Sequence, residues 1–207
     1  MLAEGFSVQH LAIAAAATAV FIGAGAGTVT SMTSAAPTTP VEVSNPMISG
    51  AAMLPGETIL QNAAKSPEHT AFVSEMKAAG LSSMLNGAGS YTVFAPTDAA
   101  YSALGNGKMA AVLKSQKSAR YLIVKGRYDS TRLLQLINEQ GGQVKLHTLE
   151  GGTIVASLNG PTNIMLMDEN GNMADIAIYD INQKNGVIQV IDRVLTPSKN
   201  ARQVAAR

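Results

Sequence analysis

The order of the predicted elements assigns this chain to the α+β class. In the first half, apolar residues recur at helical spacing, and Gly80 and the 105–107 turn each end a helix. From residue 143 onward the pattern changes to short β segments separated by turn residues. Because helices precede a run of strands, we expect helices mainly in the N-terminal half, packed on mostly antiparallel strands from the C-terminal half.

The expected helices are short. Within residues 68–79, Phe72, Val73 and Met76 share one helix face, which predicts a buried stripe. The expected helices are 58–64, 68–79, 81–85, 99–104, 117–124 and 131–139.

Strands are expected at 91–95, 144–149, 153–158, 163–167, 173–179 and 187–195. The 91–95 strand should join the sheet formed by the later strands. Residues 168–172 (Asp-Glu-Asn-Gly-Asn) resemble a calcium loop in composition. They lack the ligand spacing and the closing Glu of an EF-hand, so they predict a hairpin turn.

Residues 91–101 (YTVFAPTDAAY) predict a strand that turns directly into a helix. Pro96 cannot donate to a sheet, so the strand should end there. Thr97 or Asp98 can accept hydrogen bonds from the free amides of the next helical turn, and Asp98 also favours the positive end of the helix dipole. Both are expected to be structural caps, because Asp98 has no acid–base partner nearby in sequence.

Residues 185–197 (NGVIQVIDRVLTP) open with a hairpin signal. Asn185 and Gly186 tolerate positive φ, which predicts a type I′ turn. The apolar run that follows predicts a buried strand, and Asp192 lies within it. A buried carboxylate needs a partner, and Arg193 should point to the opposite face. We therefore expect Asp192 to be a structural lock, bonded across the fold near the Thr97 corner.

Together, the order, spacing and residue identities of these two segments resemble the paired signature of the fasciclin (FAS1) domain, over about residues 57–197. The resemblance implies a FAS1-like fold in which helices pack on a wedge of strands. It also implies an extracytoplasmic, non-catalytic module for binding or cell adhesion, without a cofactor.

Two family histidines are replaced in this chain. The family's central Tyr-His pair corresponds to Tyr121 and Leu122, and the His of the second segment corresponds to Gln189. The resemblance implies a contact role for Tyr121, whereas any role of the imidazoles is absent. In some animal members an Asp-Ile pair is implicated in integrin contact, and the matching positions are Asp180 and Ile181.

The N-terminus is predicted to be a targeting segment. Residues 11–29 are apolar and uncharged, and small residues follow them. Residues 1–36 are thus expected to be a signal peptide, or an uncleaved membrane anchor as the alternative. Residues 37–56, rich in Pro, Thr and Ser, predict a flexible linker, residues 57–197 the domain and 198–207 a tail. A secreted or periplasmic bacterial protein fits the leader and the absence of Asn-x-Ser/Thr sequons.

Charge is nearly balanced, at +1 for the chain and about +2 without the leader, so nucleic acid is not an expected partner. Between residues 108 and 132 there are seven basic residues and one acid. Lys114, Lys117 and Arg120 are spaced to share one helix face. Such a face predicts contact with an anionic glycan, lipid headgroups or an acidic protein.

Signals for catalysis or metal binding are missing from the sequence. The chain has no cysteine, no Gly-x-Ser-x-Gly elbow and three histidines that are far apart. We expect no enzyme activity, no metal and no cofactor. The expected partner is a surface protein or an anionic glycan. The alternatives are a periplasmic protein that binds a small molecule or lipid, and a membrane-tethered structural domain.

Overall fold

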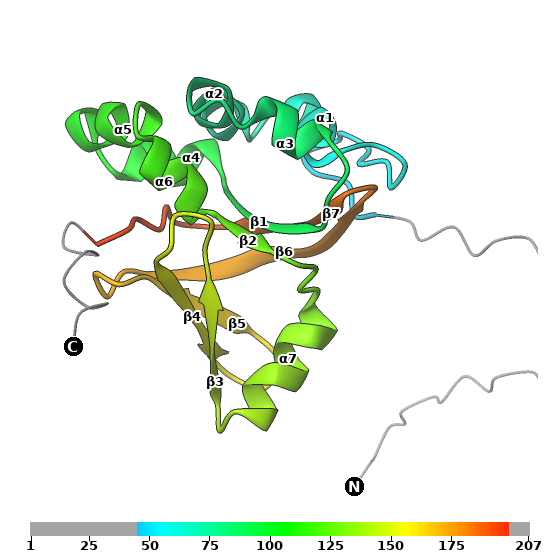
Figure 1. Ribbon diagram of the computed structural model, residues 1–207, viewed down its shortest axis with the longest axis vertical. Helices are drawn as coiled ribbons and strands as arrows, with labels where there is room; N and C mark the ends of the chain where they lie inside the picture. The colour runs from blue at the N-terminus through cyan, green and yellow to red at the C-terminus, as the bar shows by residue number, and fades with distance from the viewer. Residues whose placement is uncertain (1–44, 199–207) are drawn as a thin grey trace, which may run out of the picture. The chain divides into compact units, whose positions relative to one another are not determined.

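A seven-stranded sheet forms the centre of the computed structural model, which describes residues 45–198 (Figure 1). Its strand order is β2-β1-β7-β6-β5-β4-β3, and every pairing is antiparallel except that of β1 with β7. The strands are β1 (Tyr91–Pro96), β2 (Ile123–Lys125), β3 (Gln143–His147), β4 (Thr153–Leu158), β5 (Ile164–Met167), β6 (Met173–Gln183) and β7 (Gly186–Ile191). The expected α+β class and the joining of the 91–95 strand to the late sheet are confirmed.

Strand β6 connects two parts of the sheet. Its first residues pair with β5 and its later residues with β7, with register shifts between Ile176 and Ile178 and between Ile178 and Ile181. Irregularities of this kind bend a strand and increase its twist. At the far ends, Leu149 donates to the carbonyl of Ile123 (2.8 Å) and Val124 bridges Thr148. The two outer strands therefore approach each other, and the sheet curls into a wedge.

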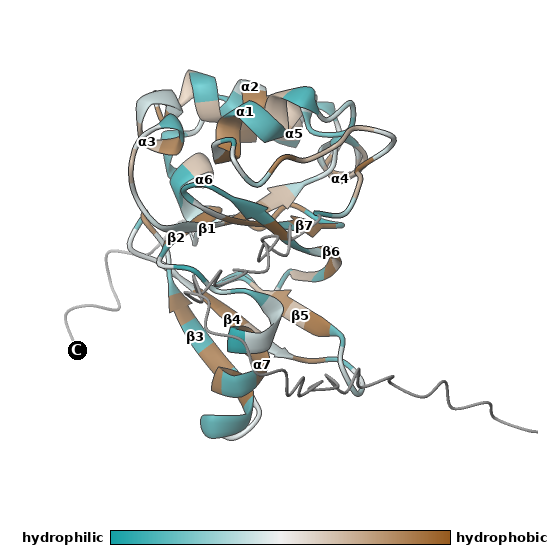
Figure 2. Ribbon diagram, turned by 90° about the vertical axis from the view of Figure 1, so that its right-hand side faces the viewer, coloured by the Kyte–Doolittle hydropathy of each residue, from teal (hydrophilic) through white to brown (hydrophobic). Residues whose placement is uncertain are grey.

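Six helices cover the β1–β2–β7 part of the sheet, and a seventh packs against β3 and β4 (Figure 1). The helices are α1 (Ile59–Lys65), α2 (Thr70–Ala78), α3 (Ser82–Asn86), α4 (Asp98–Ala103), α5 (Asn106–Leu113), α6 (Gln116–Tyr121) and α7 (Ser130–Glu139). Phe72, Val73 and Met76 of α2 are buried, as their spacing predicts. Figure 2 shows hydrophobic and hydrophilic bands alternating along β3, which matches a strand with one buried face.

The helix predicted at 117–124 is too long. Helix α6 ends at Tyr121, and Ile123 begins the short strand β2. An apolar run such as 122–124 suits a buried helix and a buried strand equally well, so its pattern does not distinguish them. Helix α5 was not predicted. Gly105, with φ of 78°, turns the chain at its start instead of ending the helical region.

The linker predicted at 37–56 is wrong for residues 45–56, which pack on the domain. The Asn45 side chain donates to the carbonyl of Asn182 (2.6 Å) and accepts from its amide (2.7 Å). Ile48 and Met53 are buried in the core. The leader (1–36), residues 37–44 and residues 199–207 of the predicted tail lie outside the described residues. Within 45–198, no helix has the length and apolar character that crossing a membrane requires.

Candidate functional site

The Thr97–Asp98 corner is a double helix cap. Thr97 Oγ1 accepts from the amide of Ala100 (3.3 Å) and caps α4, as predicted. Asp98 caps a different helix, because its carboxylate accepts from the amide and hydroxyl of Thr70 (3.2 and 2.6 Å) and from the amide of Ala71 (2.8 Å). Both residues therefore stabilise the fold, and Asp98 holds the start of α2 against α4.

The type I′ turn predicted at Asn185–Gly186 is wrong. Gln183 pairs with Gly186, so Lys184 and Asn185 form the turn, and neither has positive φ. Asn185 is buried instead. Its side chain accepts from the amide of Ile59 (2.9 Å) and donates to the carbonyls of Leu85, in α3, and Gly87, just after α3. Gly186 is required by close packing, since a Cβ there would lie 2.0 Å from the Tyr91 carbonyl oxygen.

The expected burial of Asp192 is also wrong. The chain leaves strand geometry after Ile191, and the Asp192 side chain is 45% exposed. Its carboxylate accepts from the amide of Asp175 (2.8 Å) on β6, not from the Thr97 corner. Arg193 Nε lies 4.0 Å from Asp192 Oδ2, because the alternation of faces in a strand no longer separates these neighbours. Asp192 is thus a surface link between two strand ends.

Gln189, which stands where the family has His, joins three segments of the chain. It is fully buried, donates to Asp180 Oδ1 (2.9 Å) and to the Tyr128 carbonyl (3.2 Å), and accepts from the Asp180 amide (3.0 Å). Asp180 has φ of 58° and accepts from the amide (2.7 Å) and the hydroxyl of Ser130. Ile181 is fully buried. The Asp180–Ile181 pair therefore fixes β6 to α7 and presents no exposed apolar side chain to a partner.

Tyr121 is an interior residue and not a surface contact. Its hydroxyl donates to the Thr153 carbonyl (2.6 Å) and accepts from the Glu169 amide (3.2 Å). Burial raises the pKa of this phenol above its usual value, and nearby carboxylates add to the effect. Leu122, in place of the other family His, is fully buried. Tyr121 thus joins α6 to β4 and to the β5–β6 turn.

The turn predicted at residues 168–172 is confirmed. Asp168 is buried and accepts from the amides of Asn170 and Asn172 (both 2.9 Å) within the turn. It also accepts from the Thr196 amide (2.9 Å), which holds the end of the domain on this turn.

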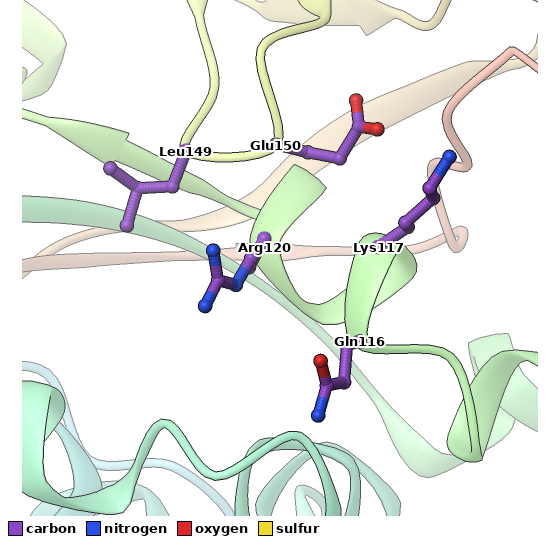
Figure 3. A pocket seen from close by; sticks show the side chains of 5 residues that line it. All are labelled: Gln116, Lys117, Arg120, Leu149 and Glu150. Atoms are coloured by element: carbon purple, nitrogen blue, oxygen red, sulfur yellow. The ribbon is translucent and has the colours of Figure 1, made fainter.

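A hollow of about 280 Å³ lies between α6 and the β3–β4 loop. Its lining residues are Gln116, Lys117, Arg120, Leu149 and Glu150 (Figure 3). In that view Lys117 and Glu150 extend to one side of α6, whereas Arg120 and Gln116 extend away from them. The hollow is therefore open to solvent and carries charged side chains on both sides of one helix.

The charges of this hollow have no partners in the described part of the chain. Lys117 and Arg120 are exposed and make neither an ion pair nor a side-chain hydrogen bond within residues 45–198. Glu150 Oε2 is shielded from solvent, and no group in the same range donates to it. Lys114 does not join them on one helix face as predicted, because it follows the end of α5 and Ser115 caps a new helix.

Sequence reasoning missed a buried ionisable pair in the helical layer. Glu75 of α2 is fully buried and accepts from the Tyr101 hydroxyl, and burial raises the pKa of Glu75 to about 7. Burial likewise raises the pKa of Tyr101. A signal existed: Glu75 lies three residues after Phe72 and next to Met76, on the stripe that was predicted to be buried.

His69 is a second buried ionisable group. Its Nδ1 lies 2.7 Å from Ser66 Oγ. Burial lowers the pKa of His69, although Asp98, Glu68 and the Ala95 carbonyl act in the opposite direction. Neither His69 nor Glu75 lines the hollow. These groups affect the stability of the fold.

The fold and the hollow together define an α+β module whose buried polar residues hold the chain together and whose unpaired charges face outward. The chain belongs to the fasciclin family, since the Fasciclin domain matches residues 67–197. Fasciclin domains are typically non-enzymatic modules of cell-adhesion proteins.

This chain covers most of one relative and a small share of another. Protein sll1483 of Synechocystis sp. is 30% identical over 158 residues, which are 73% of this chain and 79% of that protein. The transforming growth factor-beta-induced protein ig-h3 of Sus scrofa is 32% identical over 132 residues, or 63% of this chain but 18% of that protein. This chain thus corresponds to a minor part of ig-h3.

Among solved structures, the FAS1 domain pair of the insect cell adhesion molecule Fasciclin I has the same fold. The TM-score is 0.57 at 21% identity, and the match covers 69% of this chain and 52% of that chain. At this identity the likeness concerns the fold alone.

Proposed function

We propose that this chain is a non-catalytic adhesion module that acts outside the cytoplasm and contacts an acidic glycan through the hollow beside α6. The observation that carries the proposal is the exposure of Lys117 and Arg120 without an ion-pair partner in the described residues. Family membership supports the adhesion class. The apolar leader at residues 1–36 supports a secreted or periplasmic location, and an uncleaved leader would instead tether the module to a membrane.

The charges on the hollow favour a glycan over a protein partner. Lys117 and Arg120 attract carboxylate or sulfate groups. Glu150 Oε2 has no donor among the described residues, so it can accept a hydrogen bond from a ligand hydroxyl. Acidic sugars carry anionic groups beside many hydroxyl donors, so one acidic sugar unit supplies both kinds of partner.

A second cavity within residues 45–198 is too small to enclose a small molecule or lipid. It has a volume of only about 10 Å³ and lies among Ile48, Met53 and His69. That volume is near the minimum for one water molecule. The binding of a small molecule or lipid in the periplasm, which the sequence left open, is therefore the weaker proposal.

Retention on immobilised heparin, a sulfated glycan rich in uronate, tests the proposed contact. The Lys117→Glu/Arg120→Glu variant should elute at clearly lower salt than the wild type, because ionic contacts are screened by salt. A matched control, Lys108→Glu/Lys145→Glu, makes the same change in net charge at two other exposed lysines and should elute much later than the test variant. Equal elution of the two variants would show that only net charge matters and would reject the site.

A further inference from the structure

The outer face of the β4–β5–β6 sheet carries an unusual set of sulfur atoms. Along these strands, residues that point to the core and to α7 are buried, and those between them are half-buried or exposed. Met165, Met167 and Met173 all belong to the outer set, and Met173 is 49% exposed. Methionine is ordinarily among the residues most often found in the interior. Three on one open face therefore need an explanation other than core packing.

The register of β5 and β6 places these three side chains together. Met167 pairs directly with Met173, and Met165 lies two residues from Met167 on the same face. Directly opposed residues of an antiparallel pair have Cβ atoms about 5 Å apart, and residues two apart on a strand lie about 7 Å apart. Because methionine is unbranched and flexible, the three thioether sulfurs can reach one common point.

The charge beside this cluster favours a cation. Asp175 pairs with Met165, so its carboxylate lies on the same face, where Asn163 Nδ2 donates to Oδ1 (3.1 Å). Lys145 of β3 pairs with Val155 of β4, and Val155 pairs with Met167 of β5, so Lys145 lies two strands away from Met167. The nearest formal charge in the strand register is thus negative.

We propose that Met165, Met167 and Met173 form a binding site for a soft monovalent metal ion, with Cu(I) as the expected ligand. Thioethers select Cu(I) over hard cations such as Mg²⁺ and Ca²⁺. The chain has no cysteine, and His, Asp and Glu form no group of three within residues 45–198 that could hold a metal ion. The thioether cluster is therefore the site where soft-metal chemistry is expected. This inference is independent of the glycan contact.

Anaerobic titration of the protein with Cu(I), against a coloured Cu(I) chelator, tests the site. The wild type should bind one ion, and Met165→Leu/Met167→Leu/Met173→Leu should weaken binding at least about tenfold. Leucine keeps the apolar volume and should preserve the fold, which circular dichroism checks. The control Met47→Leu/Met84→Leu removes two methionines that lie outside the β4–β5–β6 face, Met47 exposed and Met84 partly buried, and should bind as the wild type does.

A second readout locates the ion directly. With ¹³C-methyl-labelled methionine and Ag(I) as a closed-shell substitute for Cu(I), the methyl resonances of Met165, Met167 and Met173 should shift together. Wild-type affinity equal to that of the triple variant would overturn the proposal. So would shifts confined to other methionines.

Discussion

Strands β6 and β7 and the turn that joins them form a seam that contains Asn185 and Gln189. This seam and the hollow beside α6 both contain polar side chains, but those of the seam are bonded within the protein and those of the hollow are not. In the seam, the Asn185 amide makes three hydrogen bonds to backbone groups, and the Gln189 amide makes three to Asp180 and Tyr128. In the hollow, the side chains of Lys117 and Arg120 bond to no described residue. A polar side chain in a family signature can therefore have a purely structural role and make no contact with a partner.

The difference follows from the cost of burying polar groups. A buried amide or carboxylate without a partner is unfavourable, so the seam must satisfy each of them internally. Exposed lysine and arginine carry no such penalty, and they stay free to bind a partner. Substitutions in the seam should therefore change stability, and substitutions in the hollow should change binding.

The largest loss of stability is expected for Gly186→Ala. The new Cβ would lie 2.0 Å from the Tyr91 carbonyl oxygen, a backbone atom that cannot move without separating β1 from β7. The free energy of unfolding should fall by about 5 kcal/mol, among the largest effects of single substitutions. Urea unfolding measures this loss.

Gly107→Ala is the control, because the Cβ would meet nothing within 4 Å there and the position is helical. That variant should gain about 0.5–1 kcal/mol. Comparable stability of the two variants would contradict the role given to Gly186.

Asn185→Ala should cost about 4 kcal/mol, because it leaves the amide of Ile59 and the carbonyls of Leu85 and Gly87 without their partner. Thermal or urea unfolding will measure the change. Asn138→Ala, at an exposed position of α7, removes the same side chain and should change stability by less than about 0.5 kcal/mol. If both variants unfolded alike, Asn185 would not be the link between α1, α3 and the seam.

Glu75→Gln should remove a pH dependence of stability. In the unfolded chain the carboxyl ionises at its usual pKa of 4.5, whereas in the folded chain the pKa is about 7. The folded state therefore binds more protons between these values, and the free energy of unfolding falls as pH rises from 4.5 to 7. Above pH 7 the variant should be more stable by up to about 3 kcal/mol.

Urea unfolding of both proteins at pH 5 and pH 8 measures this change. The lowered pKa of His69 acts in the opposite direction, since the folded state then binds fewer protons near pH 6. The contribution of His69 to the pH dependence is present in both the wild type and Glu75→Gln, so it cancels when their unfolding free energies are subtracted. Equal pH slopes for Glu75→Gln and the wild type would show that Glu75 is not the group that titrates.

The smallest effect on stability is expected in the hollow. Lys117→Glu/Arg120→Glu breaks no bond between described residues, so the unfolding free energy should change by less than about 0.5 kcal/mol. If the free energy of unfolding fell by several kcal/mol, Lys117 and Arg120 would have a structural role like that of Asn185. Any effect on glycan retention would then reflect unfolding.

The sequence allowed the class, six of the seven strands and the Thr97 cap to be predicted, because each depends on neighbours in the chain. The role of Asn185 could not be predicted, since its partner at Ile59 lies 126 residues away. Strand β2, three residues long, was assigned to a helix because a short apolar run suits either state.

For the hollow, the sequence indicated Lys117 and Arg120, but Leu149 and Glu150 come from the β3–β4 loop and only the fold brings them near. Asp180, Ile181 and Tyr121 were chosen as contacts by resemblance, and burial removes Ile181 and Tyr121 from that role. Ile181 follows two register shifts in β6, and Tyr121 is the last residue of the short helix α6, so no local pattern revealed their burial.

We infer that the hollow, and not the Asp180–Ile181 pair, contacts the partner. Titration of ¹⁵N-labelled protein with a heparin tetrasaccharide, followed through the backbone amide shifts, tests this contact. The shifts should be concentrated at Gln116, Lys117, Arg120, Leu149 and Glu150, with Asp180 and Ile181 unchanged. Shifts centred on 180–181 with the hollow unchanged would contradict it.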